Sequence, residues 1–100
     1  MCILDADEMN RDLNDMEDFA DRLVAYRKDT AEQCETIEAL VNNAVSKGAF
    51  SDPDAELAAQ RILGWVKAIR AELPEADTMA AALRESAARG WEAKRILNEL

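Results

Sequence analysis

The chain has 100 residues, 49% of them apolar and 33% charged, so it is long enough to bury a core and too apolar to stay disordered. Its 21 acidic and 12 basic side chains give a formal net charge of −9. This charge repels nucleic-acid phosphates and anionic lipid headgroups. It argues against direct nucleic-acid or membrane binding and favours a partner protein with a basic surface.

The two cysteines, Cys2 and Cys34, are far apart, and acidic residues follow the short apolar run 1–4 at once. Neither a disulfide framework nor a secretory signal is predicted, which favours a reducing setting. No segment approaches the roughly 20 apolar residues that a membrane-spanning helix needs. We therefore expect a soluble, cytoplasmic protein.

The first predicted helix begins near Asp5, because an Asp followed three residues later by Glu8 resembles a capping box. Apolar residues then recur at alternating steps of four and three, which places them on one helix face. The first part of this stripe is Met9, Leu13, Met16, Ala20 and Leu23, and the second part, in the same register, is Cys34, Ile37, Val41 and Ala44. Gly48 is expected to end the helix.

Arg27 and Thr30 occupy the stripe positions between these two parts. One interpretation is a continuous helix of about 60 Å, at 1.5 Å per residue. The alternative is a break near residues 27–30, since Thr30 and Gln33 form a second capping signature. We slightly favour the continuous helix.

The second predicted helix has a clear start, because Asp52 can cap it and Pro53 suits the first helical position. Its expected inward face is Ala58, Ile62, Trp65, Val66, Ile69 and Leu73. Pro74 disfavours helical geometry at Leu73, and Asp77 can cap a third helix that ends near Glu99.

The third helix is expected to bury Met79, Leu83 and Leu97. Small residues lie along the same stripe and predict a close helix crossing: Ala82, Ser86, Gly90 and Ala93. The sequence thus predicts an all-α fold, a small bundle of three helices that forms a single domain over residues 1–100.

Catalytic chemistry has few candidate residues. The chain has no His, which removes the commonest general base and most zinc chemistry. Asp52, Asp54 and Glu56 resemble the opening of a calcium loop, but Leu57 stands where that loop needs Gly, so we interpret them as capping residues. Cys34 lies on the apolar stripe and is expected to be buried. We predict no enzyme activity, no metal site and no cofactor.

A concentration of acidic residues is the most distinctive feature. Residues 5–21 contain eight acidic side chains against the single Arg11. The predicted partner-binding face consists of Asp7, Glu8, Asp12, Asp15, Asp18 and Asp21, with Glu8, Asp12 and Asp15 along one flank of the apolar stripe and Asp7, Asp18 and Asp21 on the far side. The alternative is that the charge only keeps the protein soluble.

Trp91 and Ile96 point away from the predicted stripe of the third helix. Large exposed apolar groups often mark contact sites, so these two residues are candidates for a second contact surface. The alternative is that neighbouring helices on two sides bury them.

These observations favour a non-catalytic interaction protein whose acidic first helix binds a basic, nucleic-acid-handling partner and inhibits it by occupancy. In general character the chain is similar to the small acidic inhibitors that phages encode, including anti-CRISPR proteins, although no motif matches a particular family. The alternative is a structural or chaperone-like homodimer in which the small residues and the Trp91 region form the subunit interface.

Overall fold

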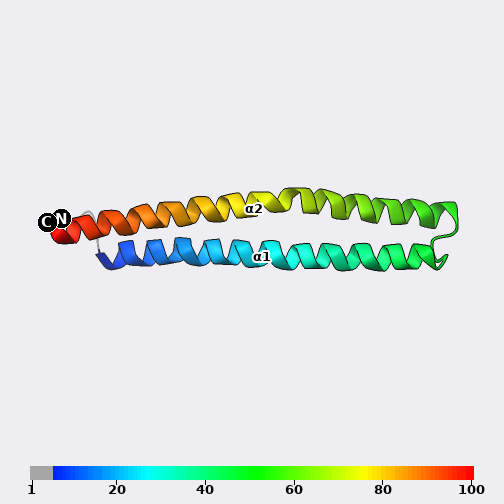
Figure 1. Cartoon of the computed structure of the whole chain (residues 1–100), viewed down its shortest axis with the longest axis horizontal. Helices are drawn as coiled ribbons and strands as arrows, with labels where there is room; N and C mark the ends of the chain where they lie inside the picture. The colour runs from blue at the N-terminus through cyan, green and yellow to red at the C-terminus, as the bar shows by residue number, and fades with distance from the viewer. Residues whose placement is uncertain (1–5) are drawn as a thin grey trace. The chain divides into compact units, whose positions relative to one another are not determined.

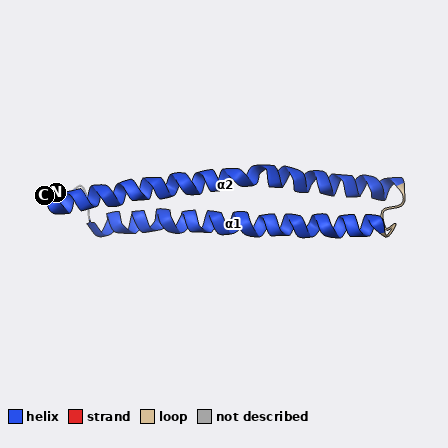
Figure 2. Cartoon of the chain, in the orientation of Figure 1, coloured by secondary structure: helices blue, strands red, loops and turns tan. Residues whose placement is uncertain are grey.

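The computed structural model describes residues 6–100, apart from the side chain of Ala6. Within that range the chain forms two helices, α1 (Ala6–Ser46) and α2 (Pro53–Glu99), and no strand (Figures 1 and 2). The all-α prediction is confirmed. The prediction of three helices is wrong, because the second and third predicted helices are one.

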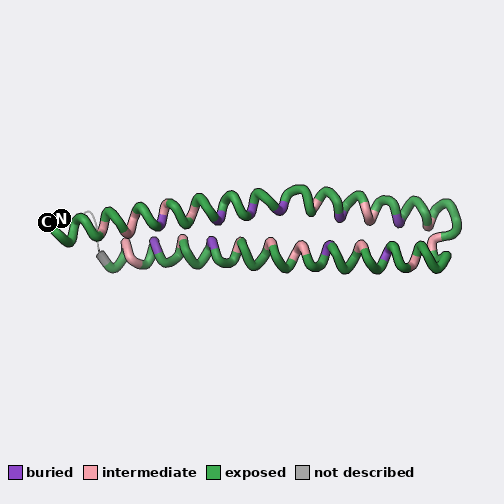
Figure 3. The backbone as a smooth tube through the Cα atoms, in the orientation of Figure 1, coloured by how far each residue is buried: buried purple, intermediate pink, exposed green. Residues whose placement is uncertain are grey.

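Helix α1 is continuous, so the predicted alternative of a break near residues 27–30 is wrong. No Gly or Pro interrupts it, and Arg27 and Thr30 are partly buried in the same register as the residues around them. The residues buried at intervals of seven or fourteen are Leu13, Ala20, Cys34 and Val41, all from the predicted stripe (Figure 3). Ile37, which was also predicted on that stripe, is exposed. The predicted start at Asp5 lies outside the described residues.

Gly48 ends α1 as predicted. Its φ of 79° is in the left-handed region that only Gly adopts readily. The Gly48 amide donates to the Val45 carbonyl at 3.0 Å, and the Ala49 amide donates to the Ala44 carbonyl at 2.9 Å. These two bonds form a Schellman motif, which satisfies the last carbonyls of the helix.

The start of α2 also matches the prediction. Pro53 is its first residue, and the side chain of Asp52 accepts a hydrogen bond from the Ala55 amide at 2.8 Å. Asp52 therefore caps the helix and is explained without a calcium loop.

Helix α2 continues through Pro74, which corrects the predicted break at Leu73 and the predicted third-helix start at Asp77. A proline inside a helix removes one hydrogen bond and costs about 3 kcal/mol. Leu73 and Ala76, on either side of Pro74 and three residues apart, are both buried. Packing on both sides offsets the local cost, so tertiary contacts override the local signal.

The buried face of α2 is rotated from the predicted one. Its fully buried residues recur mainly every seven residues: Ala59, Val66, Leu73, Ala80 and Ala87, with Ala76 from the neighbouring row. Of the predicted inward residues of the second helix, Val66 and Leu73 are buried and Ile62 and Ile69 are partly buried, whereas Ala58 and Trp65 are exposed. Of the third-helix residues, Leu83, Ser86 and Gly90 are partly buried, but Met79, Ala82, Ala93 and Leu97 are exposed. A contact between two helices covers about two positions per heptad, a narrower stripe than a three-helix bundle would cover.

The chain divides into two compact units, each of which combines a segment of α1 with a segment of α2. Unit 1 comprises Met1–Ala25 and Glu75–Leu100, and unit 2 comprises Tyr26–Pro74. The prediction that residues 1–100 form a single domain stays a prediction.

Unit 2 is an antiparallel helical hairpin closed by the loop at residues 47–52. We call the row of buried residues where the two helical segments meet the seam. In unit 2 it contains Cys34, Val41 and Val66, and beside it the Arg70 guanidinium pairs with Glu38 at 3.0 Å.

In unit 1 the two helical segments are also antiparallel, and their seam is lined by small residues such as Ala20 and Ala87. A methyl group added at Gly90 would overlap the Leu13 side chain, so the helices approach closely there. The predicted close crossing is thus present, but the buried alanines that form it are Ala76, Ala80 and Ala87.

Candidate functional site

The carboxylates of the predicted binding face all lie on the exposed surface of α1 in unit 1. Asp7, Glu8, Asp12, Asp15, Asp18 and Asp21 are exposed, as is Glu17. They differ in what surrounds them, and that difference divides the face into a paired part and an open part.

The paired carboxylates bind cations or donors within unit 1. Asp21 pairs with Arg84 of α2 at 2.9 Å, and Asp18 pairs with Arg22 of α1 at 3.1 Å. Glu17 accepts a hydrogen bond from the indole Nε1 of Trp91. Exposed ion pairs of this kind are worth about 0 to 1 kcal/mol each, so a partner's cations could replace them at small cost.

The open carboxylates are Glu8, Asp12 and Asp15, which we call the open acidic flank. None of the three forms an ion pair or hydrogen bond with a side chain among residues 6–100. They lie within residues 8–15 along one side of α1, a distance of about 10 Å at 1.5 Å per residue. This flank therefore presents three exposed carboxylates that form no ion pair in the described part of the molecule, with Arg11 as the one basic residue between Glu8 and Asp15.

The arginines near the end of α2 are bound within their own helix. Arg89 pairs with Glu85 at 3.2 Å, and Arg95 pairs with both Glu92 and Glu99. The hydrogen bond from Arg95 lowers the pKa of Glu92 and raises that of Arg95. These cations pair within α2 and not with the open acidic flank of α1.

Trp91 and Ile96, the predicted apolar contact, have different surroundings. Trp91 is partly buried, its indole donates to Glu17, and the Lys94 ammonium lies 5.4 Å from its ring centroid. Lys94 also donates to the side chain of Asn10 on α1. Ile96 is exposed. Trp91 thus joins α2 to α1 inside unit 1, and the structure does not gather the two residues into one exposed patch.

The predicted ridge of small residues is only partly internal to unit 1. Ser86 and Gly90 are partly buried and Gly90 lies against Leu13 of α1, whereas Ala82 and Ala93 are exposed. The contact between the two helical segments is made instead by Ala80 and Ala87, which are buried.

The exposed apolar residues of unit 2 were missed in the sequence. Trp65, which was predicted to face inward, is 67% exposed, Leu40 is 64% exposed and Tyr26 is 60% exposed. A signal for them does exist in the seven-residue register. Tyr26 and Leu40 each directly precede a seam position of α1, and Trp65 directly precedes Val66 of α2.

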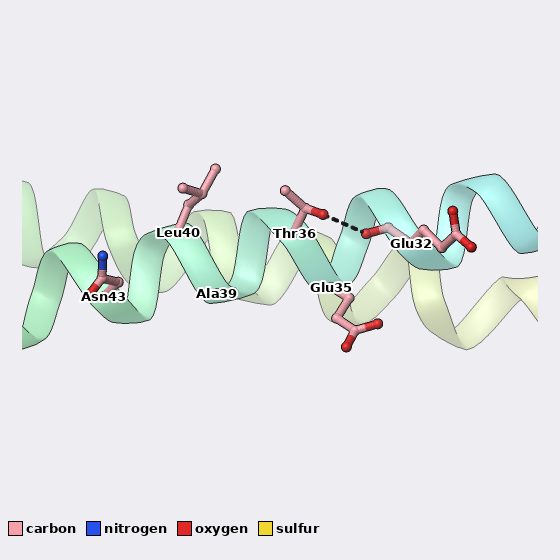
Figure 4. Close-up of a pocket in the computed structure, with 6 residues that line it drawn as sticks. All are labelled: Glu32, Glu35, Thr36, Ala39, Leu40 and Asn43. Atoms are coloured by element: carbon pink, nitrogen blue, oxygen red, sulfur yellow. Dashed lines mark hydrogen bonds between the residues drawn. The ribbon is translucent and has the colours of Figure 1, made fainter.

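A shallow hollow lies on α1 of unit 2, lined by Glu32, Glu35, Thr36, Ala39, Leu40 and Asn43 (Figure 4). All six lining residues are exposed and belong to α1. Thr36 and Leu40 point to one side of the helix and Glu35 to the opposite side, and the Thr36 hydroxyl donates to the backbone carbonyl of Glu32 at 3.0 Å. This open surface of a single helix lacks the convergent polar groups of an enclosed ligand site.

Cys34 is a buried free thiol in the seam of unit 2, as predicted. Among the described residues, no group of three or more Cys, Asp or Glu side chains is arranged to hold a metal ion. Neither described helix contains an apolar stretch long enough to cross a membrane. No protein-family model, curated protein or solved structure matches the chain.

Proposed function

We propose that this chain is a non-catalytic interaction protein that docks on a basic surface of another protein through the open acidic flank of α1. The observation that carries the proposal is that Glu8, Asp12 and Asp15 are exposed and form no ion pair among residues 6–100, not even with Arg11 on the same helix. Because these carboxylates have no internal ion pair to break, a partner's Lys and Arg side chains gain their full attraction.

The remaining predicted carboxylates extend this surface. Asp18 and Asp21 are held only by exposed pairs, and Asp7 lies at the start of the same helix. By sequence, unit 1 contains 13 acidic and six basic side chains, whereas unit 2 contains eight and six. The negative potential that steers a cationic partner is therefore concentrated in unit 1.

The partner class follows from the charge. Proteins that hold nucleic acid cluster Lys and Arg to neutralise phosphates, so a row of carboxylates competes for the same cations. A chain bound there inhibits its partner by occupying the nucleic-acid site. A phage-encoded inhibitor of the anti-CRISPR type is one concrete setting for such an activity.

The test compares the full-length chain with two variants of equal net charge. In the flank variant, Glu8→Gln, Asp12→Asn and Asp15→Asn remove the three open carboxylates. In the control variant, Asp29→Asn, Glu32→Gln and Glu35→Gln remove three exposed carboxylates of α1 in unit 2. Each chain is immobilised, exposed to host lysate at about 50 mM salt and eluted with salt, since screening weakens such binding.

The wild-type and control chains should retain the same basic proteins, and the flank variant should retain at most about a tenth as much, a loss of about 1.4 kcal/mol or more. A double-stranded DNA competitor should release those proteins from the wild-type chain. Equal retention by the flank and control variants would contradict the proposal, because binding would then follow bulk charge only.

A further inference from the structure

Six large apolar side chains among residues 6–99 are at least 51% exposed, and five of them share one position of the heptad. The five are Phe19, Tyr26, Leu40, Trp65 and Met79, and the sixth, Leu97, lies at another position. We assign the heptad letters a to g along both helices so that Leu13 of α1 and Val66 of α2 are at position a. Each of the five side chains is then at position g, directly before an a position. This shared position shows that their exposure follows the repeat and is not scattered.

In unit 2 the two edges beside the seam carry different chemistry. The e edge carries the ion pair between Glu38 of α1 and Arg70 of α2, together with the exposed Val45 of α1. Because e faces e in an antiparallel pair with this register, the opposite edge carries the g residues Leu40 and Trp65. Ile37, a seam residue adjoining Leu40, is also exposed. We call Tyr26, Ile37, Leu40 and Trp65 the apolar edge.

Helices that are apolar at a, d and g are typical of bundles larger than two helices. A helix in a two-stranded pair needs about two apolar positions in seven, whereas a helix in a bundle needs about three. Unit 2 contains only two helical segments. Its apolar residues at positions a, d and g are therefore typical of a helix with more neighbouring helices than the unit contains.

Charge identifies a second copy of the chain as the occupant of this edge. Two copies of unit 1 repel each other, because each carries seven more acidic than basic side chains, but unit 2 carries only two more. The four residues of the apolar edge are uncharged, so this edge is also complementary to itself, and a twofold axis closes such an interface. The charged Glu72 lies at the next g position of α2 after Trp65. A strongly basic partner, in contrast, is attracted to unit 1.

The area of unit 2 reaches the lower end of the range for a dimer interface. The helical segments of unit 2 are each about 20 residues, or about 30 Å long, and two helices side by side are about 20 Å wide. Their face is on the order of 600 Å² before the relief of the side chains is added, and specific interfaces bury about 600 to 1,000 Å² per partner.

We propose that two copies of the chain associate through the apolar edge of unit 2, so that Leu40 and Trp65 of each copy are covered by the helices of the other. The four helical segments brought together in this way complete a four-helix bundle core. This interface is separate from the open acidic flank, and neither proposal depends on the other.

The test is sedimentation equilibrium of the full chain over a concentration series. The wild-type chain should be a dimer, and the double variant Leu40→Ala with Trp65→Ala should dissociate at least about tenfold more readily. Alanine keeps helix propensity, so circular dichroism should show unchanged helicity. Leu57→Ala, which removes an exposed apolar residue outside the edge, is the matched control and should shift the equilibrium less than about twofold.

Salt and fluorescence provide independent readouts. Rising salt should strengthen the dimer by screening its negative charge, whereas it should release a basic partner from the flank. In a Trp91→Phe background, Trp65 emission should shift to longer wavelength on dilution. The proposal would be overturned if the chain is monomeric up to about 1 mM, or if the double variant dissociates no more readily than the wild-type chain. It would also be overturned if Trp65 is buried only when a different protein is bound.

Discussion

The two units use the same heptad register but differ in the size of most buried side chains. The seam of unit 2 contains Val41, Val66 and Leu73, whereas that of unit 1 contains mainly alanines, such as Ala80 and Ala87, beside Leu13. Small residues allow the helix backbones to approach but bury less apolar area, and hydrophobic stabilisation follows that area. We infer that unit 2 contributes most of the free energy of folding, while unit 1 carries most of the net negative charge.

The largest effect is expected from removing apolar volume in unit 2. Leu73→Ala deletes a buried side chain, and leucine truncations in cores cost about 2 to 5 kcal/mol. Urea unfolding at fixed chain concentration measures the loss. A cost below about 1 kcal/mol would show that the seam of unit 2 is not the main source of stability.

The opposite change tests the close packing of unit 1. Ala87→Leu adds volume at a fully buried position, and overpacking costs about 1 to 3 kcal/mol. Ala88→Leu, at the exposed neighbour, is the control and should change stability by less than about 0.5 kcal/mol. If the two variants unfold at the same urea concentration, the helices of unit 1 are not in close contact at Ala87.

The smallest effect on stability is expected from replacing the helical glycine of each unit by alanine. Gly64→Ala in unit 2 meets nothing within 4 Å and should stabilise the chain by about 0.5 to 1 kcal/mol through helix propensity. Gly90→Ala in unit 1 should lose that gain, because its methyl group must displace Leu13. Thermal unfolding of both variants measures the difference, and equal gains would contradict the close contact.

The seam of α1 could be predicted because its stripe combines few alanines with large apolar residues such as Leu13 and Val41 at clear intervals. The seam of α2 could not, because neighbouring alanines at 58 and 59, at 80 to 82 and at 87 and 88 allow several stripes. Which of these stripes is buried depends on the packing against α1, and that packing leaves Trp65 exposed.

The two helix ends at the loop were also predictable, because Gly48 and Asp52 act through local backbone hydrogen bonds. Pro74 was misjudged because its local cost is opposed by packing that a linear pattern does not reveal. The candidate site was only partly predictable for a related reason. The acidic residues are evident in the sequence, but which of them stay open depends on pairings such as Asp21 with Arg84, 63 positions apart.

The most direct measurement of the docking surface is a residue-resolved NMR titration of the full chain with a short oligo-arginine peptide at low salt. Amide shifts should concentrate at residues 8–18 of α1 and should vanish as salt reduces the Debye length from about 10 Å to about 3 Å. Shifts of equal size at Asp29, Glu32 and Glu35 would show that these carboxylates attract cations as strongly, and the open acidic flank would then have no special role.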